Sequence, residues 1–180
     1  MKPGIALAAA LSIGALASAS ASASQPYAGQ DDRSIKALSS EQTTGLKEGS
    51  GLGYAKAAEL NGWPGPLHAL ELQAELALSA DQIDRMQALR QAMLDAAVPL
   101  GQALIQAEAA LDRLFAGDAP TPAAVAAATE AIALIEGQLR AAHLVAHIAA
   151  RPVLTPHQRM IYAELRGYGA APGKGHGHHR

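Results

Sequence analysis

Two histidines, His143 and His147, lie four residues apart in a segment with helical periodicity. At this spacing their side chains share one face of a helix, and neighbouring imidazoles are a common part of transition-metal sites. Glu136 lies seven residues before His143 on the same stripe. If this helix folds back against the preceding one, Asp95 and Gln91 come to lie opposite the pair. The pattern predicts either a metal site of two histidines and a carboxylate, or histidines that only hydrogen-bond Asp95 or water.

Three further histidines, His176, His178 and His179, lie in residues 170–180, which are rich in Gly and Pro. This composition lacks apolar periodicity and predicts disorder. Short His-rich tracts can bind Zn²⁺, Ni²⁺ or Cu²⁺ loosely. The segment is therefore either a weak metal-binding tail or a solvated tail with accidental metal affinity.

The chain carries no recognisable catalytic set. It has no cysteine, which excludes thiol catalysis and thiolate metal ligands. A phosphate-binding loop and a Gly-x-Ser-x-Gly motif are absent, and no Glu follows His143 to act as the base of a zinc protease. We expect a protein that is not an enzyme and has no organic cofactor, so that Zn, Ni, Co or Cu ions are its candidate ligands.

A repeated phrase frames the segment that carries the histidine pair. Each copy reads Leu, then Ser or Thr, two free positions, and Gln; its residues are Leu78, Ser79 and Gln82 in the first copy and Leu154, Thr155 and Gln158 in the second. The hydroxyl can accept a hydrogen bond from the first helical turn, while the Gln reaches back to the N–H of the cap residue. Both copies therefore predict helix starts, and residues 38–42 are a weaker echo of the same phrase.

The periodicity between and around these phrases predicts an all-α fold. A heptad lattice over residues 81–115 is apolar except at Arg90, and Pro99 with Gly101 predicts a kink in this helix. A short break at 117–120 precedes a second long helix that ends near Ala150, so the two helices should form an antiparallel hairpin. Shorter helices are expected at residues 40–47, 54–60, 66–76 and 155–165.

The predicted core is small. The chain has one Phe and one Trp, and many seam positions are Ala, whose burial contributes much less than that of a large apolar side chain. We therefore expect a homodimer, or an open shape that a second copy stabilises.

Residues 1–23 are typical of a secretion signal. Lys2 precedes an apolar stretch at 5–16 and an Ala-Ser run at 17–23, which predicts cleavage near Ala23 and a periplasmic location. Removing Lys2 leaves 13 basic against 16 acidic groups, a formal charge of −3, which argues against nucleic acid or an anionic membrane as the main partner. Residues 24–65 read as an irregular, Gly-rich segment with short helices, 66–169 as the helical domain, and no membrane span is expected in the mature chain.

The doubled phrase and the exported hairpin resemble the Spy/CpxP family of periplasmic proteins, whose signature is Leu-Thr-x-x-Gln in two copies. Its relatives include zinc-resistance-associated and nickel/cobalt-sensing proteins. The resemblance covers about residues 67–169, although Ser79 replaces Thr and the chain is slightly acidic. It implies a curved helical hairpin that dimerises into a cradle, together with metal-responsive sensing or ATP-independent binding of unfolded envelope proteins. In this resemblance, His143 and His147 look like the paired helical ligands of the metal-responsive members.

Three functions follow as hypotheses. The first is a periplasmic accessory protein of heavy-metal response or resistance, which binds ions through His143 and His147. The second is an ATP-independent chaperone that holds unfolded envelope proteins. The third is a structural or regulatory envelope protein with one dedicated partner, such as an inner-membrane sensor.

Overall fold

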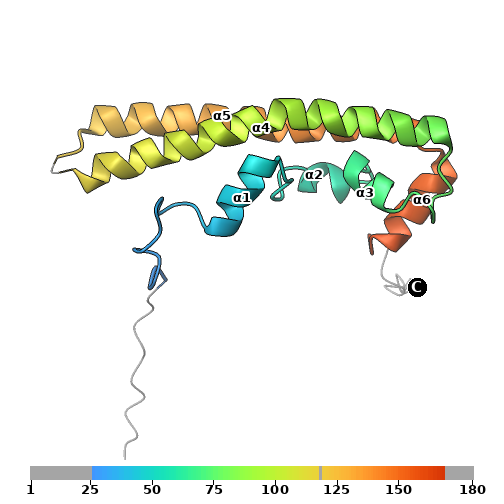
Figure 1. The fold of residues 1–180 in the computed structure, drawn as a ribbon, viewed down its shortest axis with the longest axis horizontal. Coiled ribbons are helices and arrows are strands. Elements are labelled where there is room, and N and C mark those ends of the chain that lie inside the picture. Colours follow the sequence, from blue (N-terminus) through green and yellow to red (C-terminus); the bar gives the residue numbers. More distant parts are fainter. Residues whose placement is uncertain (1–25, 118, 169–180) are drawn as a thin grey trace, which may run out of the picture. The chain divides into compact units, whose positions relative to one another are not determined.

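The computed structural model describes residues 26–117 and 119–168, and within them every regular element is helical. The chain divides into two compact units, Met1–Asp31 and Asp32–Arg180, and all the helices belong to the second. They are α1 (Ser40–Glu48), α2 (Lys56–Glu59), α3 (Pro66–Glu71), α4 (Ala80–Ala116), α5 (Pro122–Ala150), the 3₁₀ turn η1 (Arg151–Val153) and α6 (Pro156–Leu165) (Figure 1). The predicted all-α fold is confirmed. The expected leader at 1–23 and the tail at 170–180 lie outside the described residues.

The two long helices, α4 and α5, pack side by side as the predicted hairpin (Figure 1). Three positions of the apolar lattice expected in α4 are fully buried: Met86, Ala97 and Leu104. Ala97 and Leu104 cluster with the buried Ile132 and Leu139 of α5, whereas Met86 clusters with buried residues of α3, η1 and α6. Pro99 lies inside α4, which continues through it as one helix. The kink expected there stays a prediction, as does the dimer.

Shorter elements cover the hairpin at two places. At the end of the hairpin where α4 begins and α5 ends, buried residues of α3, α4, η1 and α6 form one apolar cluster around Met86 and Tyr162. Near the middle, Leu46 of α1 joins Ala97, Leu104 and Leu139 in a second cluster. The segment 32–65, for which the sequence suggests no role, is therefore packed onto α4 and α5.

Both copies of the repeated phrase form complete capping boxes, with Ser79 and Thr155 as the caps. The structure also joins the two boxes to each other. Gln82 donates to the side-chain oxygen of Gln158 at 2.8 Å, and Gln158 donates back at 3.1 Å. The second amide N–H of each Gln reaches a carbonyl: Gln82 bonds that of Val153 at 2.8 Å, and Gln158 bonds that of Leu76 at 3.1 Å. We call this arrangement the glutamine clasp; it holds the start of α4 against the start of α6.

The echo of the phrase at residues 38–42 also forms a capping box, with Ser39 as the cap of α1 and Gln42 reaching back to it. This third Gln is exposed and has no glutamine partner among its side-chain contacts. It is therefore the same capping box without the clasp.

The helix predicted over residues 66–76 is shorter than expected, because α3 ends at Glu71. The chain instead turns, with Ala77 in a left-handed conformation (φ 46°) and the N–H of Leu78 bonded to the carbonyl of Gln73. This turn brings the Leu76 carbonyl to the clasp, so a tertiary contact replaces the last helical turn. The expected helix at 54–60 is likewise reduced to α2. No helix within residues 26–117 and 119–168 is long and apolar enough to cross a membrane.

Candidate functional site

The histidine pair lies on the buried side of α5. His143 is 4 % exposed and His147 is 8 % exposed. The ring of His143 stacks on that of Tyr54, with ring centres 5.8 Å apart and planes 12° from parallel. The pair therefore faces the segment between α1 and α3, which covers it, and not the solvent.

The orientation of His147 is set by a backbone carbonyl. Its Nδ1 lies 2.8 Å from the carbonyl oxygen of Trp63, and a carbonyl can only accept, so Nδ1 carries the hydrogen. In the neutral ring this leaves the lone pair on Nε2. Metal-binding histidines are commonly held in this way, with one ring nitrogen donating to a carbonyl or carboxylate and the other bound to the ion.

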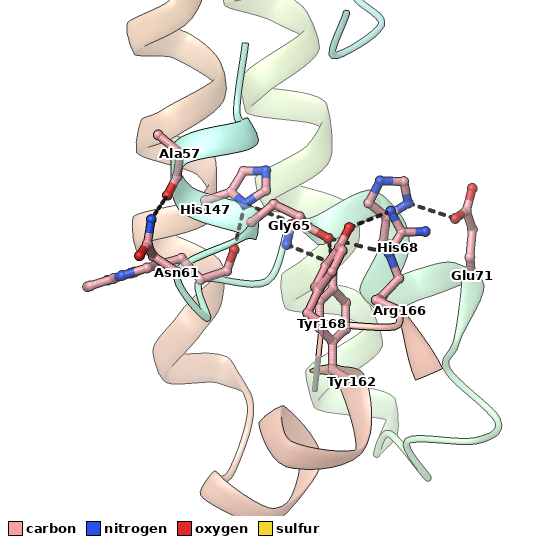
Figure 2. A network of polar contacts seen from close by, with 11 residues as sticks. Ala57, Asn61, Gly65, His68, Glu71, His147, Tyr162, Arg166 and Tyr168 are labelled. Atoms are coloured by element: carbon pink, nitrogen blue, oxygen red, sulfur yellow. Dashed lines mark hydrogen bonds and ion pairs between the residues drawn. The ribbon is translucent and has the colours of Figure 1, made fainter. Parts of the chain in front are cut away.

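A buried carboxylate lies beside His147. Glu59 of α2 is 8 % exposed, and its Oε2 lies 3.5 Å from Nδ1 of His147. Its Oε1 accepts a hydrogen bond from Tyr162 and lies 3.4 Å from Nε of Arg166. This network, drawn in Figure 2, ties α2, α5 and α6 together around one negative charge. Burial raises the pKa of Tyr162, and the adjacent Glu59 raises it further, so the phenol stays protonated and acts as a donor.

Three polar atoms in this region are buried without a hydrogen-bond partner: Nε2 of His143, Oε2 of Glu59 and Nε of Arg166, which pairs with Glu59 only through their charges. Most buried polar atoms in proteins have a partner, and an unpartnered one needs an explanation. A cation bound at either the His143 nitrogen or the Glu59 oxygen would satisfy that atom. A lone pair on an imidazole nitrogen is a ligand for a transition metal, and a carboxylate oxygen nearby offsets positive charge.

Burial lowers the pKa of His143, and the neighbouring His147 lowers it further. The imidazole is then neutral at physiological pH, which is the form that binds metal ions. Proton competition for this nitrogen begins only at lower pH than for an ordinary histidine.

The same shift predicts how stability depends on pH. The folded protein disfavours the charged form of His143, so the unfolded chain binds more protons as the pH falls below about 6.5. Stability should therefore fall as the pH drops from 7.5 to 5.5, and His143→Gln should remove part of that loss. Urea denaturation of the wild type and the variant at several pH values measures this loss of stability. His157→Gln, at an exposed position, is the control; an equal change in both variants would contradict the assignment.

A cavity of about 440 Å³ adjoins the pair. Its wall includes His143, His147 and Glu59, together with apolar residues of the covering segment and of α4 such as Leu52, Met93 and Leu94. This volume is within the range of natural ligand pockets, which are mostly apolar with a few polar groups. The two histidines, together with His68, therefore line a space large enough for a small ligand.

The carboxylates that the sequence places beside the pair do not join it. Asp95 is exposed and accepts a hydrogen bond from Gln91 at 2.8 Å. Glu136 is exposed and lines a separate cavity of about 280 Å³. In the part of the chain that the structure describes, no three His, Asp or Glu side chains lie close enough to share an ion, so the predicted site of two histidines and Asp95 or Glu136 is not formed.

The reason lies in the rotation of α5. Its seam against α4 runs through Ile132 and Leu139. His143 lies four positions after Leu139 and His147 lies eight, which at about 100° per residue rotates them by about 40° and about 80° from the seam, away from α4 and towards the covering segment. His176, His178 and His179 lie outside the described residues.

Sequence reasoning missed the groups that do surround the pair. Glu59 and the Trp63 carbonyl come from the irregular segment, which has no periodicity that could place it against α5. The only signal there is the turn at 61–66, Asn-Gly-Trp-Pro-Gly-Pro. Gly65 is needed at its end, because a Cβ at this position would lie 2.7 Å from the His147 ring.

Comparison with known protein families identifies this chain. The family model for heavy-metal resistance matches residues 49–160, which is more than half of the chain and includes both α2 and the histidine pair. No curated protein and no solved structure matches the chain.

Proposed function

Because this chain belongs to the heavy-metal resistance family, we propose that it is an exported accessory protein of heavy-metal resistance that binds transition-metal ions through His143 and His147. This family is not one of enzymes, and the proposed role is to bind the ion, not to transform it. Export rests on the leader-like residues 1–23, with cleavage expected near Ala23.

One observation carries the proposal: Nε2 of His143 is buried without a partner in a residue that lines the cavity. The hydrogen bond from His147 to Trp63 supports it, because this bond leaves the other nitrogen of His147 free for an ion. Glu59 adds a buried negative charge beside the pair. Each of these features favours a cation at this place.

Substitution of the pair tests the proposal. Calorimetric titration of the purified protein with Zn²⁺, Ni²⁺, Co²⁺ and Cu²⁺ should detect a tight site, and His143→Ala should weaken it at least tenfold. His157→Ala is the matched control, because His157 is exposed on α6. Replacing His176, His178 and His179 together should lower the number of weakly bound ions and leave the tight site. Tight binding that survives His143→Ala and His147→Ala would refute the proposal.

Client binding is a second candidate function, favoured by one observation. Leu134, Val145 and Ile148 of α5 are each about 60 % exposed, and their spacing places them on one face of the helix. Exposed apolar faces of this kind bind protein partners. The opposite face is covered by the segment 32–65, so unfolded clients would meet this outer face first. Suppression of aggregation of a reduced test protein, lost in Val145→Glu, would support this function.

A further inference from the structure

We propose that the cavity of about 440 Å³ binds a small apolar anion, a hydrocarbon body that ends in one carboxylate, and that Arg90 of α4 holds the carboxylate. This inference goes beyond the proposed function, because Arg90 and not the histidine pair recognises this ligand. It starts from a residue that the sequence marks as an exception: Arg90 is the lattice position of α4 that is not apolar.

Arg90 lies half-buried in the wall of the cavity. Met93 and Leu94, three and four residues later on the same face of α4, line the cavity as well. Among the residues that the structure describes, no ion pair and no cation–π contact involves the Arg90 guanidinium. A partly buried charge without a partner is costly, so an anion that pairs with Arg90 in the cavity gains free energy.

The other charged groups of the wall do not compensate Arg90. Glu59 is buried, but its Oε1 lies 3.4 Å from Nε of Arg166, so its charge is already offset. Glu48 and Lys56 carry opposite charges and are both exposed, where water and salt screen them. The half-buried positive charge of Arg90 therefore favours an anion over a neutral molecule or a cation of the same shape.

The rest of the wall fits the hydrocarbon body of such a ligand. Leu52, Leu60 and Leu67 line the cavity and are 42 %, 58 % and 42 % exposed, although burial stabilises apolar side chains. Exposed apolar surface around a concave site is typical of a binding site. A hydrocarbon body seated in the cavity would cover these leucines and remove their apolar surface from water.

The charge of the ligand follows from the single guanidinium. Its planar fork can donate two parallel N–H bonds to the two oxygens of a carboxylate. A dianion such as a phosphate monoester would bring a second negative charge into apolar surroundings, where Arg90 is the cation of the wall that is partly shielded from water. We therefore infer a monoanion, such as a medium-chain carboxylic acid.

Displacement of a fluorescent apolar anion tests the inference. The purified protein is loaded with 1-anilinonaphthalene-8-sulfonate, and decanoate, decanol and decyltrimethylammonium each compete with it. We expect decanoate to bind at least tenfold more tightly than the other two, which share its chain but not its charge. Arg90→Gln should weaken decanoate at least tenfold and change decanol by less than twofold. Arg85→Gln is the matched control, because Arg85 is an exposed residue of the same helix that pairs with Asp81.

The three ligands on the wild type decide the inference even if Arg90→Gln does not fold. Equal affinities for decanoate and decanol, or equal losses of decanoate binding in Arg85→Gln and Arg90→Gln, would overturn it. Arg90 would then only cover the apolar wall with its alkyl chain. The proposed function is tested separately by metal titration of His143→Ala, so metal binding without decanoate binding leaves that function standing, and the reverse result leaves only this inference standing.

Discussion

Gln158→Leu is expected to lower the free energy of unfolding by about 3–4 kcal/mol, since it removes four hydrogen bonds of about 1 kcal/mol each from a buried position. The Gln158 oxygen accepts from the N–H of Thr155 at 2.9 Å and from Gln82 at 2.8 Å. Its amide donates to the Leu76 carbonyl and to Gln82, both at 3.1 Å. Leucine matches the size of glutamine but makes none of these bonds, so the Thr155 N–H and the Leu76 carbonyl lose their partner, while Gln82 keeps its bonds to Ser79 and Val153. Urea denaturation measures the loss as a lower midpoint with an unchanged slope.

The third capping box supplies the control. Gln42 makes the same return bond to its cap, Ser39, at 2.9 Å, but it is exposed and outside the clasp. Gln42→Leu should therefore cost only about 0.5–1 kcal/mol, the usual value of one capping bond. Equal losses in Gln42→Leu and Gln158→Leu would mean that capping alone explains the repeated Gln.

A double-mutant cycle isolates the clasp itself. In Gln82→Leu with Gln158→Leu, both partners of the clasp are apolar, so the combined loss should be smaller than the sum of the single losses by about 1 kcal/mol or more. Gln42→Leu combined with Gln158→Leu should be additive, because the two residues share no contact. Strict additivity in both pairs would show that the two glutamines do not depend on each other.

The glutamine clasp shows which features could be predicted from the sequence and which could not. The capping boxes at Ser79 and Thr155 follow from residues three positions apart, and the hairpin follows from apolar periodicity with a short break. These signals are local, so the helices and their starts could be predicted. That Gln82 and Gln158 meet is a contact over 76 positions, for which one sequence carries no local signal.

The candidate site likewise has one part that could be predicted from local sequence and one part that could not. The shared face of His143 and His147 follows from their spacing, which is a local property. Their neighbours depend on the rotation of α5 about its axis and on the path of an irregular segment. The structure therefore places Asp95 away from the pair, bonded to Gln91, and places Glu59 beside it, for which the residues around Glu59 in the sequence give no signal. Its contact with His147 could be found only once the segment was placed on α5.

The packing of α1 against α4 is sensitive to substitution at Gly101. A Cβ at Gly101 would lie 2.1 Å from the carbonyl oxygen of Leu46 and 2.8 Å from its carbon. The conflict is with the backbone of α1, which no rotamer change relieves. Gly101→Ala should therefore destabilise the protein by about 2 kcal/mol through overpacking, even though alanine is the better helix former by about 1 kcal/mol.

Gly137 on α5 gives the opposite expectation. It is exposed, and a Cβ there would meet no atom within 4 Å. Gly137→Ala should stabilise the protein by about 0.5–1 kcal/mol through helix propensity alone. Urea denaturation of both variants thus compares the same substitution in two helices, and stabilisation by both would show that α1 does not approach α4 at Gly101.

The consequence of Gly101→Ala should extend to the histidines. The backbone that follows α1 carries Tyr54, Glu59 and the Trp63 carbonyl to α5, so a displaced α1 loosens the cover over His143. Hydrogen exchange should then accelerate in α1 and α2 of Gly101→Ala, with the central turns of α4 and α5 still protected. Faster exchange spread evenly over all helices would instead indicate a general loss of stability, in which case the close contact at Gly101 does not specifically hold the cover in place.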